Sequence, residues 1–391
     1  MAALLQDSRK ATRAILGLAF FGMVVLPACN LFLPQGSFLN VPDYIIQLMG
    51  KFFCYALCAL AIDLIWGFTG ILSLGHGMFF AMGGYAMGMH LLRTAAGPGE
   101  NALPEFMLFM DWHQLPWFWK GFDNFGFALL VILVVPTLFA AIFGFFAFRS
   151  RIKGVYFSII TQAVTFALML LFFRNDTGFG GNNGLTGFKT LLGFSLLEPH
   201  TKLGLYILSV AAVVGGYFLC RFITSSKLGR ALTAIRDAES RLMFCGYSPL
   251  NYKLFVWTLS ALMCAIAGAL YVPQVGIINP GEMAPANSIE MVIWAAVGGR
   301  GTLVGPILGT FIVNWAKSWF TAAAPDFWLY FLGAIFIGTT MFLPAGIFSL
   351  GAVIAKLRGQ KDDNGSETDN SAVDQAQTPA GATHRTNGGD K

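Results

Sequence analysis

Charge is what this sequence has least of. Only 12% of its 391 residues are Asp, Glu, Lys or Arg, against about 25% in an ordinary soluble domain. Hydrophobic residues make up 56% of the chain, so too few charges remain to cover a water-facing surface of this size. The composition therefore argues against a large soluble domain and favours a protein whose surface faces lipid.

Arrangements that support catalysis or metal binding are also missing. The chain has six cysteines and five histidines. Most of the cysteines lie in apolar stretches, where Cys behaves as a small hydrophobe, and Cys54 and Cys58 share a helix face without a cluster of His or carboxylate residues. The glycine-rich run VGGRGTLVG at 297–305 lacks the Lys-Ser/Thr ending of a phosphate-binding loop. We therefore expect no enzyme, no metal and no cofactor in this chain.

Long apolar runs, by contrast, are frequent. About 20 apolar residues in a helix cross a hydrocarbon core of about 30 Å. The expected spans are 14–33, 43–66, 72–92, 125–148, 154–173, 203–221, 254–272, 302–320 and 328–350. A further apolar segment at 287–299 is too short to cross comfortably, which leaves open whether it is re-entrant. The predicted fold class is an all-α, polytopic transmembrane bundle of about nine or ten membrane segments.

Glycine is abundant, with 45 residues. Gly84-xxx-Gly88 and Gly305-xxx-Gly309 have the small-residue spacing that lets two helix backbones approach closely. We expect both pairs at helix contacts.

Basic residues gather in four places along the chain. They precede the first expected span, join the spans at 125–148 and 154–173, fill the loop at 221–253, and follow the last span. When the spans are counted in order, all four clusters fall on one side. Cytoplasmic loops carry an excess of Lys and Arg, so this side is expected to be the cytoplasm, with both termini inside and the protein in an inner (plasma) membrane.

Composition also divides the chain. Residues 1–358 form the expected transmembrane domain, which contains a basic cytoplasmic loop at 224–250. Residues 359–391 are rich in Asp, Asn, Gly, Ser and Thr without an apolar period. Such a tail buries too little surface to offset chain entropy, so it is expected to be disordered in the cytoplasm.

The loop at 224–250 has the pattern of a short amphipathic helix. One apolar stripe recurs at helical spacing: Ala231, Ile235, Ala238 and Leu242. Charged residues take other positions, and Asp237 and Arg241 are spaced to pair at i,i+4. The pattern fits two structures equally: a helix that docks in a groove on a cytoplasmic partner, or a helix held on the membrane surface by its basic residues.

Four ordered blocks of this sequence resemble one known family. They are YALCALAIDLIWGFTGILSLGHGMFFAMGGYAMG (55–88), GVYFSIITQA (154–163), GRALTAIRDAESRLMFCGYSPLNYKLFVWTLSALMCAIAGALY (229–271) and SIEMVIWAAVGGRGTLVGPILG (288–309). Between about residues 50 and 350 the chain is similar to permease subunits of branched-chain amino acid ABC importers, which are bacterial inner-membrane proteins. No resemblance points to nucleic acid.

The resemblance implies partners. These are a second permease subunit in a heterodimer, two cytoplasmic ATPase subunits that hydrolyse the ATP, and a periplasmic solute-binding protein. It also implies that the loop at 224–250 carries the coupling helix that meets the ATPase. The candidate coupling residues are Gly229, Arg230, Ala234, Ile235, Arg236, Asp237, Glu239 and Gly246.

Within that family, the run RIKGVYFSIITQAVTFALMLLFFRNDTGFGGNNGLTGF (151–188) is similar to permeases of urea importers, and its asparagine pair is the discriminating part. Urea is small, neutral and rich in donors and acceptors, so its path needs amide and hydroxyl groups rather than a charge clamp. The candidate pathway residues are Ser73, His76, Thr161, Gln162, Asn182, Asn183, Asn287 and Ser288. A branched-chain amino acid is the alternative solute, and an ATP-independent channel or secondary transporter is the alternative mechanism.

Structural roles compete with functional ones at several polar positions. The asparagine pair also fits a turn, and His76 also fits packing between helices. Asp63 is expected in interfacial water at the cytoplasmic end of its span. His90 and Lys317 are expected to snorkel to the outer interface, and Glu290 is expected to cap the helix that begins near it.

Overall fold

The computed structural model describes residues 12–32, 41–97, 102–152, 154–324, 327–342 and Gly346. These residues belong to one unit, Met1–Phe348. The tail predicted at 359–391 lies outside the described residues, as does the end of the last predicted span apart from Gly346.

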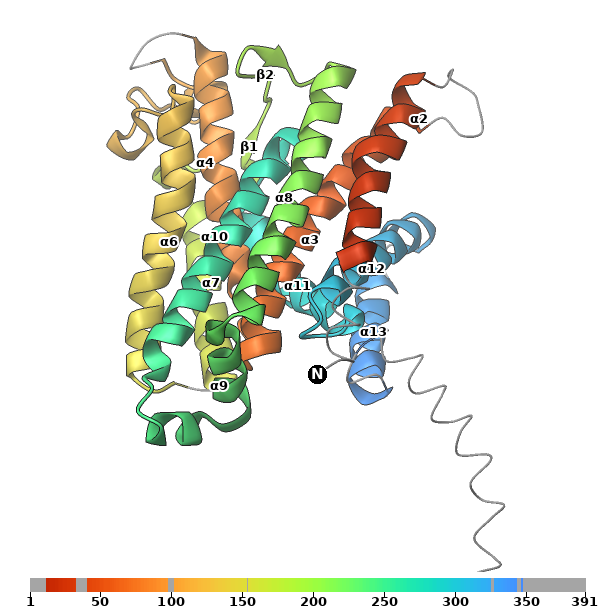
Figure 1. The fold of residues 1–391 in the computed structure, drawn as a ribbon. Helices are drawn as coiled ribbons and strands as arrows, with labels where there is room; N and C mark the ends of the chain where they lie inside the picture. The colour runs from red at the N-terminus through yellow and green to blue at the C-terminus, as the bar shows by residue number, and fades with distance from the viewer. Residues whose placement is uncertain are drawn as a thin grey trace, which may run out of the picture. The chain divides into compact units, whose positions relative to one another are not determined.

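Helices make up most of the described chain (Figure 1). An N-terminal helical stretch, Thr12–Leu31, contains the π-helical turn η1 (Phe21–Val25) and runs into α2 (Leu26–Phe32). The other helices are α3 (Asp43–Thr69), α4 (His76–Ala96), α5 (Glu105–Phe109), α6 (Phe125–Arg149), α7 (Val155–Phe173), α8 (Pro199–Ser225), α9 (Lys227–Phe244), α10 (Pro249–Val275), α11 (Pro285–Gly298), α12 (Val304–Ala323) and α13 (Trp328–Phe342). Short 3-10 turns are η2 (Trp117–Trp119), η3 (Asn175–Thr177), η4 (Gly181–Asn183) and η5 (Pro280–Met283).

Six of the described helices are long and apolar enough to cross a membrane: Thr12–Leu31, α3, α6, α7, α8 and α10. They match six of the predicted spans and confirm an all-α membrane protein. The segments predicted at 72–92, 287–299, 302–320 and 328–350 correspond to α4, α11, α12 and α13, which are helices of smaller length or lower hydropathy.

The strands are confined to two short ladders. They are β1 (Leu185–Thr186) with β4 (Ile277–Ile278), and β2 (Thr190–Leu191) with β3 (Phe194–Ser195), both antiparallel. Leu185 faces Ile278 across the first ladder. A Cβ built on Gly84 would lie 3.0 Å from the Cδ1 of Ile278, and one on Gly88 would lie 3.2 Å from its Cγ2. The predicted helix contact is therefore present at Gly84, which also packs against Val272 of α10, whereas Gly88 packs against the strands.

The centre of the bundle is formed by α3, α4 and α10, and α10 packs against both of the others. Glycines let α4 and α10 meet backbone to backbone. A Cβ on Gly83 would overlap the carbonyl of Ala265, and one on Gly268 would overlap that of Phe80. Lipid is as apolar as the side chains, so the hydrophobic effect does not drive these helices together. Close packing at small residues holds them together instead.

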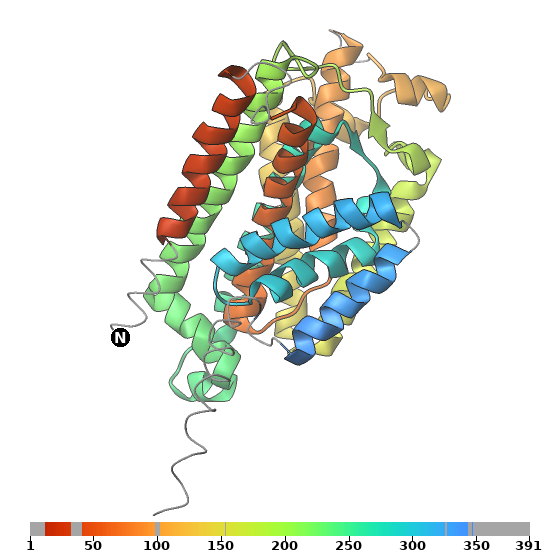
Figure 2. The same cartoon turned by 90° about the vertical axis from the view of Figure 1, so that its right-hand side faces the viewer.

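The hairpin of α11 and α12 lies across the upright helices, as Figure 2 shows. Here the predicted small-residue contact is confirmed. A Cβ on Gly305 would overlap the carbonyl of Gly298, and one on Gly309 would overlap that of Trp294. The two helices are therefore held together through their backbones.

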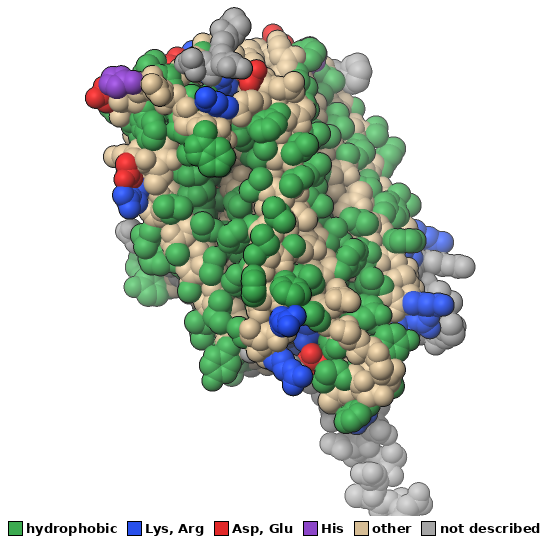
Figure 3. Space-filling view, turned by 90° about the vertical axis from the view of Figure 1, so that its left-hand side faces the viewer, with side chains coloured by type: hydrophobic (Ala, Val, Ile, Leu, Met, Phe, Trp, Pro, Cys, Tyr) green, Lys and Arg blue, Asp and Glu red, His purple; other side chains and the backbone are tan. Residues whose placement is uncertain are grey.

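The outer surface is largely hydrophobic. On the face drawn in Figure 3, charged side chains lie mostly toward the two ends, and hydrophobic ones fill the middle. The most apolar of the six candidate spans is α6, which is 22% buried over its most apolar stretch, and Thr12–Leu31 is 17% buried. One end carries α9 together with the turn between α6 and α7, and we call it the α9 end; the other carries the loops at 102–124 and 174–198.

Candidate functional site

Four of the predicted pathway residues meet at the N-terminus of α4. The segment at 71–75 follows α3 outside any helix, and hydroxyls from α7 supply hydrogen-bond partners to it. Ser158 donates to the carbonyl of Leu72 over 2.7 Å, and the N–H of Leu74 donates to Thr161 over 3.2 Å. Ser73 is buried and accepts from the N–H of Gly75 over 3.2 Å. The sharp entry into α4 is therefore fixed by neutral polar groups.

His76 joins this cluster from the first turn of α4. Its Nε2 lies 3.0 Å from the hydroxyl of Ser260, which in turn donates to the carbonyl of Trp257 over 2.9 Å. Because that hydroxyl has one proton to give, the arrangement is satisfied when His76 Nε2 carries the hydrogen. The Nδ1 of His76 is buried and has no hydrogen-bond partner.

Ser288 completes the cluster from α11. A Cβ on Gly77 would lie 2.8 Å from the hydroxyl of Ser288, so only glycine lets α4 and α11 approach this closely. That hydroxyl is buried without a hydrogen-bond partner. Ser73, His76, Thr161 and Ser288 are thus brought together, and all four are buried.

The other four predicted pathway residues lie elsewhere. Asn182 and Asn183 are exposed in η4, and Asn183 lines a separate cavity of about 380 Å³ with Glu105 and Lys189. Asn287 donates to the carbonyl of Gly281 over 2.8 Å and so closes the turn before α11. Gln162 is half-buried on α7.

The predicted amphipathic helix is present as α9, between the long helices α8 and α10. Ser226 caps it by accepting from the N–H of Leu228 over 3.1 Å. Its buried residues are Gly229, Leu232 and Ile235. Of these, only Ile235 belongs to the predicted stripe, so the buried face of the helix is rotated away from the predicted one. Of the other candidate coupling residues, Arg230, Arg236, Asp237 and Gly246 are exposed, and Ala234 and Glu239 are partly buried.

The predicted ion pair in α9 is replaced by another. Ala238 has a non-helical backbone, with φ −158° and ψ 71°. This kink breaks the i,i+4 register between Asp237 and Arg241, and Asp237 accepts instead from Nε of Arg236 over 2.9 Å. The hydrogen bond from Arg236 lowers the pKa of Asp237 below its ordinary value.

Contacts from α9 reach into the membrane helices. Arg236 Nη1 donates to the carbonyl of Gly67, near the end of α3, over 2.8 Å. Glu239 accepts from Lys253, at the start of α10, over 2.6 Å. Two hollows of about 280 Å³ and 170 Å³ flank α9, and both are lined by Phe148, Ile152, Glu239 and Lys253.

The end of α3 also holds the turn between α11 and α12. The carboxylate of Asp63 accepts from the backbone N–H of Gly301 and, over 3.0 Å, from that of Leu303. Asp63 is fully buried, so the prediction of interfacial solvation is wrong. One continuous series of contacts therefore runs from Arg236 through Gly67 and Asp63 to the α11–α12 hairpin.

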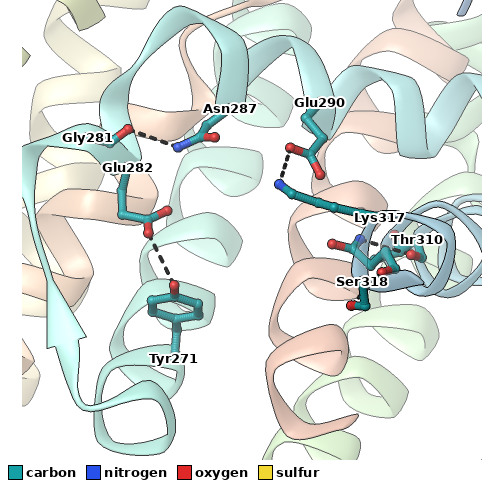
Figure 4. Close-up of polar contacts among 9 residues, drawn as sticks. Tyr271, Gly281, Glu282, Asn287, Glu290, Thr310, Lys317 and Ser318 are labelled. Carbon is teal, nitrogen blue, oxygen red and sulfur yellow. Dashed lines mark hydrogen bonds and ion pairs between the residues drawn. The ribbon is translucent and has the colours of Figure 1, made fainter. Parts of the chain in front are cut away.

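Three further polar residues differ from their predictions. Lys317 does not snorkel but donates to Glu290 over 2.6 Å (Figure 4). Glu290 is 4% exposed and belongs to this ion pair rather than to a helix cap. His90 is 3% exposed and its Nδ1 lies 2.7 Å from the carbonyl of Phe122. In each case the partner comes from a different element.

The sequence reasoning missed Glu282 and Tyr271, which are drawn in the same figure. Tyr271 donates to a carboxylate oxygen of Glu282 over 3.1 Å. A signal existed, because Glu282 and Glu290 are the only carboxylates between residues 250 and 324. Among the residues that the structure describes, no group of three or more His, Cys, Asp or Glu is placed to hold a metal ion.

Comparison with known proteins gives one family and several relatives. Residues 44–340 match the family described as branched-chain amino acid transport system / permease component. The chain is 24% identical to the high-affinity branched-chain amino acid transport system permease protein LivM of Escherichia coli, over 78% of this chain and 70% of LivM. It is 26% identical to the ribose import permease protein RbsC of Bacillus subtilis, over 38% of this chain and 48% of RbsC. It is also 26% identical to the autoinducer 2 import system permease protein LsrC of Yersinia pseudotuberculosis, over 56% of this chain and 63% of LsrC. No solved structure matches the chain.

Proposed function

Because this membrane protein belongs to the family of branched-chain amino acid transport system permease components, we propose that it is the permease subunit of an ATP-driven importer that carries urea or a similar short amide. The assembled importer would pair it with a second permease subunit, two ATPase subunits in the cytoplasm and a periplasmic solute-binding protein. The α9 end would face the cytoplasm in a bacterial inner membrane, and both termini would lie on that side.

The observation that carries this proposal is the placement of α9. It is an amphipathic helix between the two 27-residue spans α8 and α10, and it contacts α3 through Arg236 and α10 through Glu239. A partner that moved α9 would therefore act directly on the ends of two central helices. The exposed Arg230 and the flanking hollows supply a surface for that partner.

The mechanism is a change between two conformations and involves no covalent chemistry. ATP-driven closure of the ATPase subunits moves α9. The contacts of Arg236 with Gly67, and of Asp63 with the α11–α12 turn, pass this movement to α3 and to the hairpin. Since α11 borders the polar cluster through Ser288, the same movement changes access to that cluster.

The choice of urea is supported by the chemistry of the cluster at the start of α4. The hydroxyl of Ser288 and the Nδ1 of His76 have no partner, and they lie near the engaged hydroxyls of Ser73 and Thr161, as expected for a small uncharged solute with several donors and acceptors. The resemblance of the run at 151–188 to urea permeases favours the same solute. A branched-chain amino acid is the second candidate, and the similarity to LivM over 78% of the chain favours it.

Uptake by cells with and without this subunit tests the proposal. Labelled urea and labelled leucine are offered separately to cells that express the other subunits of the importer. We expect urea uptake to disappear with the subunit and leucine uptake to persist. Loss of leucine uptake alone would assign the amino acid instead and retain the transporter. Solute flux from this chain alone in liposomes, without an ATPase, would replace the importer with a channel or a secondary transporter.

A further inference from the structure

The helix α11 carries an unusual set of buried polar atoms. The hydroxyl of Ser288, the Oε1 of Glu290 and the Nε1 of Trp294 are all buried without a hydrogen-bond partner. The three residues are 1%, 4% and 2% exposed. An unsatisfied buried polar group destabilises the fold, and one 14-residue helix holds three of them. A site that receives a polar ligand part of the time accounts for them.

Two of these atoms are complementary and lie on one face. Glu290 and Trp294 are four residues apart on α11, which places their side chains next to each other. The free carboxylate oxygen of Glu290 only accepts hydrogen bonds, and the indole N–H of Trp294 only donates them. Together they match a molecule that has an N–H group beside a carbonyl oxygen.

Flat aromatic rings border the same face. The Tyr55 ring of α3 lies 4.8 Å from that of Trp294, at 31° between the planes, and 5.6 Å from that of Tyr271, at 28°. At these distances the rings pack against one another, so they form an apolar aromatic wall beside Glu290 rather than a slot between rings. The hydroxyl of Tyr271 is already engaged by Glu282 over 3.1 Å, so the ring is fixed in place.

The charges around this face cancel. Lys317 pairs with the other oxygen of Glu290 over 2.6 Å (Figure 4). Lys51, whose Nζ lies 5.6 Å from the centroid of the Tyr55 ring, interacts electrostatically with Glu282 and Glu290. Two lysines and two glutamates leave no net formal charge. A neutral guest is therefore not penalised, whereas an ion would disturb the Lys317–Glu290 pair.

We propose that Glu290 and Trp294 of α11, with the ring of Tyr55, form a binding site for a planar neutral amide on its route through the protein. The N–H groups of the amide donate to Oε1 of Glu290, and its carbonyl accepts from Nε1 of Trp294. This site rests on the proposed function. It adds the residues that would recognise the amide group of the substrate. Ser288 lies two residues before Glu290 and so faces a different side of α11, toward Gly77 and the polar cluster at the start of α4.

The substitution Trp294→Phe tests the site most cleanly. It removes the N–H and keeps an aromatic ring, whereas Glu290→Gln would also remove the ion partner of Lys317. The complete importer, with its binding protein, is reconstituted in proteoliposomes with ATP inside, and initial uptake of labelled urea is measured. Trp315→Phe is the matched control, because Trp315 is 61% exposed on α12.

We expect Trp294→Phe to slow urea uptake about 5- to 10-fold, the effect of one hydrogen bond, and Trp315→Phe to leave uptake unchanged. The midpoint of thermal unfolding supplies the second readout. The smaller ring leaves a gap in the core and lowers the midpoint with or without solute, so the informative quantity is the rise in midpoint on adding urea, which should be smaller for Trp294→Phe than for the unsubstituted importer.

Three outcomes would overturn the site. Unchanged uptake would remove Trp294 from the route. A fall in uptake with an unchanged rise in unfolding midpoint on adding urea would give the indole a purely structural role. Uptake of leucine but not urea by the unsubstituted importer would refute the proposed substrate, and the amide site with it, before any variant is compared.

Discussion

At the residue scale, the buried polar side chains of this protein are mostly fixed by partners that lie far away in the sequence. Asp63 accepts from Leu303 across 240 positions, and His76 contacts Ser260 across 184. Inside a membrane, water is not available to replace a lost partner, so such contacts are costly to break. They define which helices must stay in register.

Asp63→Asn tests this at one residue. The carboxylate accepts from two backbone N–H groups of the α11–α12 turn, whereas an amide turns its own NH₂ toward one of them. We expect destabilisation of about 1–3 kcal/mol, the cost of one unsatisfied buried group. The measurement is the midpoint of thermal unfolding of the purified protein in detergent.

Asp176→Asn is the matched control for that substitution. Asp176 pairs with Arg174 in the loop after α7, where its side chain is 62% exposed, and exposed ion pairs contribute little. The control should leave the midpoint nearly unchanged. Equal midpoints for both variants would mean that Asp63 does not hold the turn.

At the scale of elements, α9 is set apart by its charge and its connections. It follows α8 after a single capping residue, Ser226, and it kinks at Ala238. Gly229 fits against the carbonyl of Thr224, where any Cβ would overlap the backbone. The helix is therefore tied closely to α8 at its start and to α3 through Arg236, which suits it to passing movement inward.

Arg236→Glu tests that element. The substitution removes the hydrogen bond to Gly67 and places a carboxylate beside Asp237. We expect uptake by the assembled importer to fall at least 10-fold, while ATP hydrolysis continues and the protein still inserts into the membrane. Uptake and hydrolysis are measured on the same proteoliposomes.

Lys120→Glu is the control, because it makes the same change of charge in an exposed loop at the opposite end of the bundle. It should leave the ratio of solute carried to ATP hydrolysed unaltered. Coupled uptake at the normal ratio in Arg236→Glu would count against a coupling role for α9.

At the scale of the whole molecule, the distribution of charge predicts the orientation in the membrane. The α9 end carries Arg149, Arg151, Lys227 and Arg230, whereas the loops at the other end are poorer in basic residues. An excess of Lys and Arg marks the cytoplasmic side. The position of one cysteine makes this orientation measurable.

Cys245 follows α9 and is the exposed one of the six cysteines, four of which are buried and one intermediate. In membranes without the ATPase subunits, we expect a membrane-impermeant maleimide to label the protein in inside-out vesicles and not in right-side-out vesicles. Cys245→Ser should abolish the labelling. Labelling from the right-side-out face would invert the topology and remove α9 from contact with any cytoplasmic ATPase.

The sequence by itself determined the membrane spans. The runs predicted at 125–148 and 154–173 became Phe125–Arg149 and Val155–Phe173. A backbone in lipid must satisfy its own hydrogen bonds, so a long apolar run has no alternative to a helix. The sequence also predicted the amphipathic helix in the loop at 224–250 and the contact at Gly305 and Gly309. Both predictions depend on residue spacing along a single segment.

Only the tertiary structure decided which polar groups meet. Nothing near Lys317 in sequence indicates Glu290, 27 residues earlier, and nothing near His76 indicates Ser260, 184 residues later. The buried face of α9 and the unpaired atoms of Glu290 and Trp294 likewise depend on how separate helices pack. Periodicity describes one element at a time, whereas burial and pairing are properties of the surfaces that two elements present to each other.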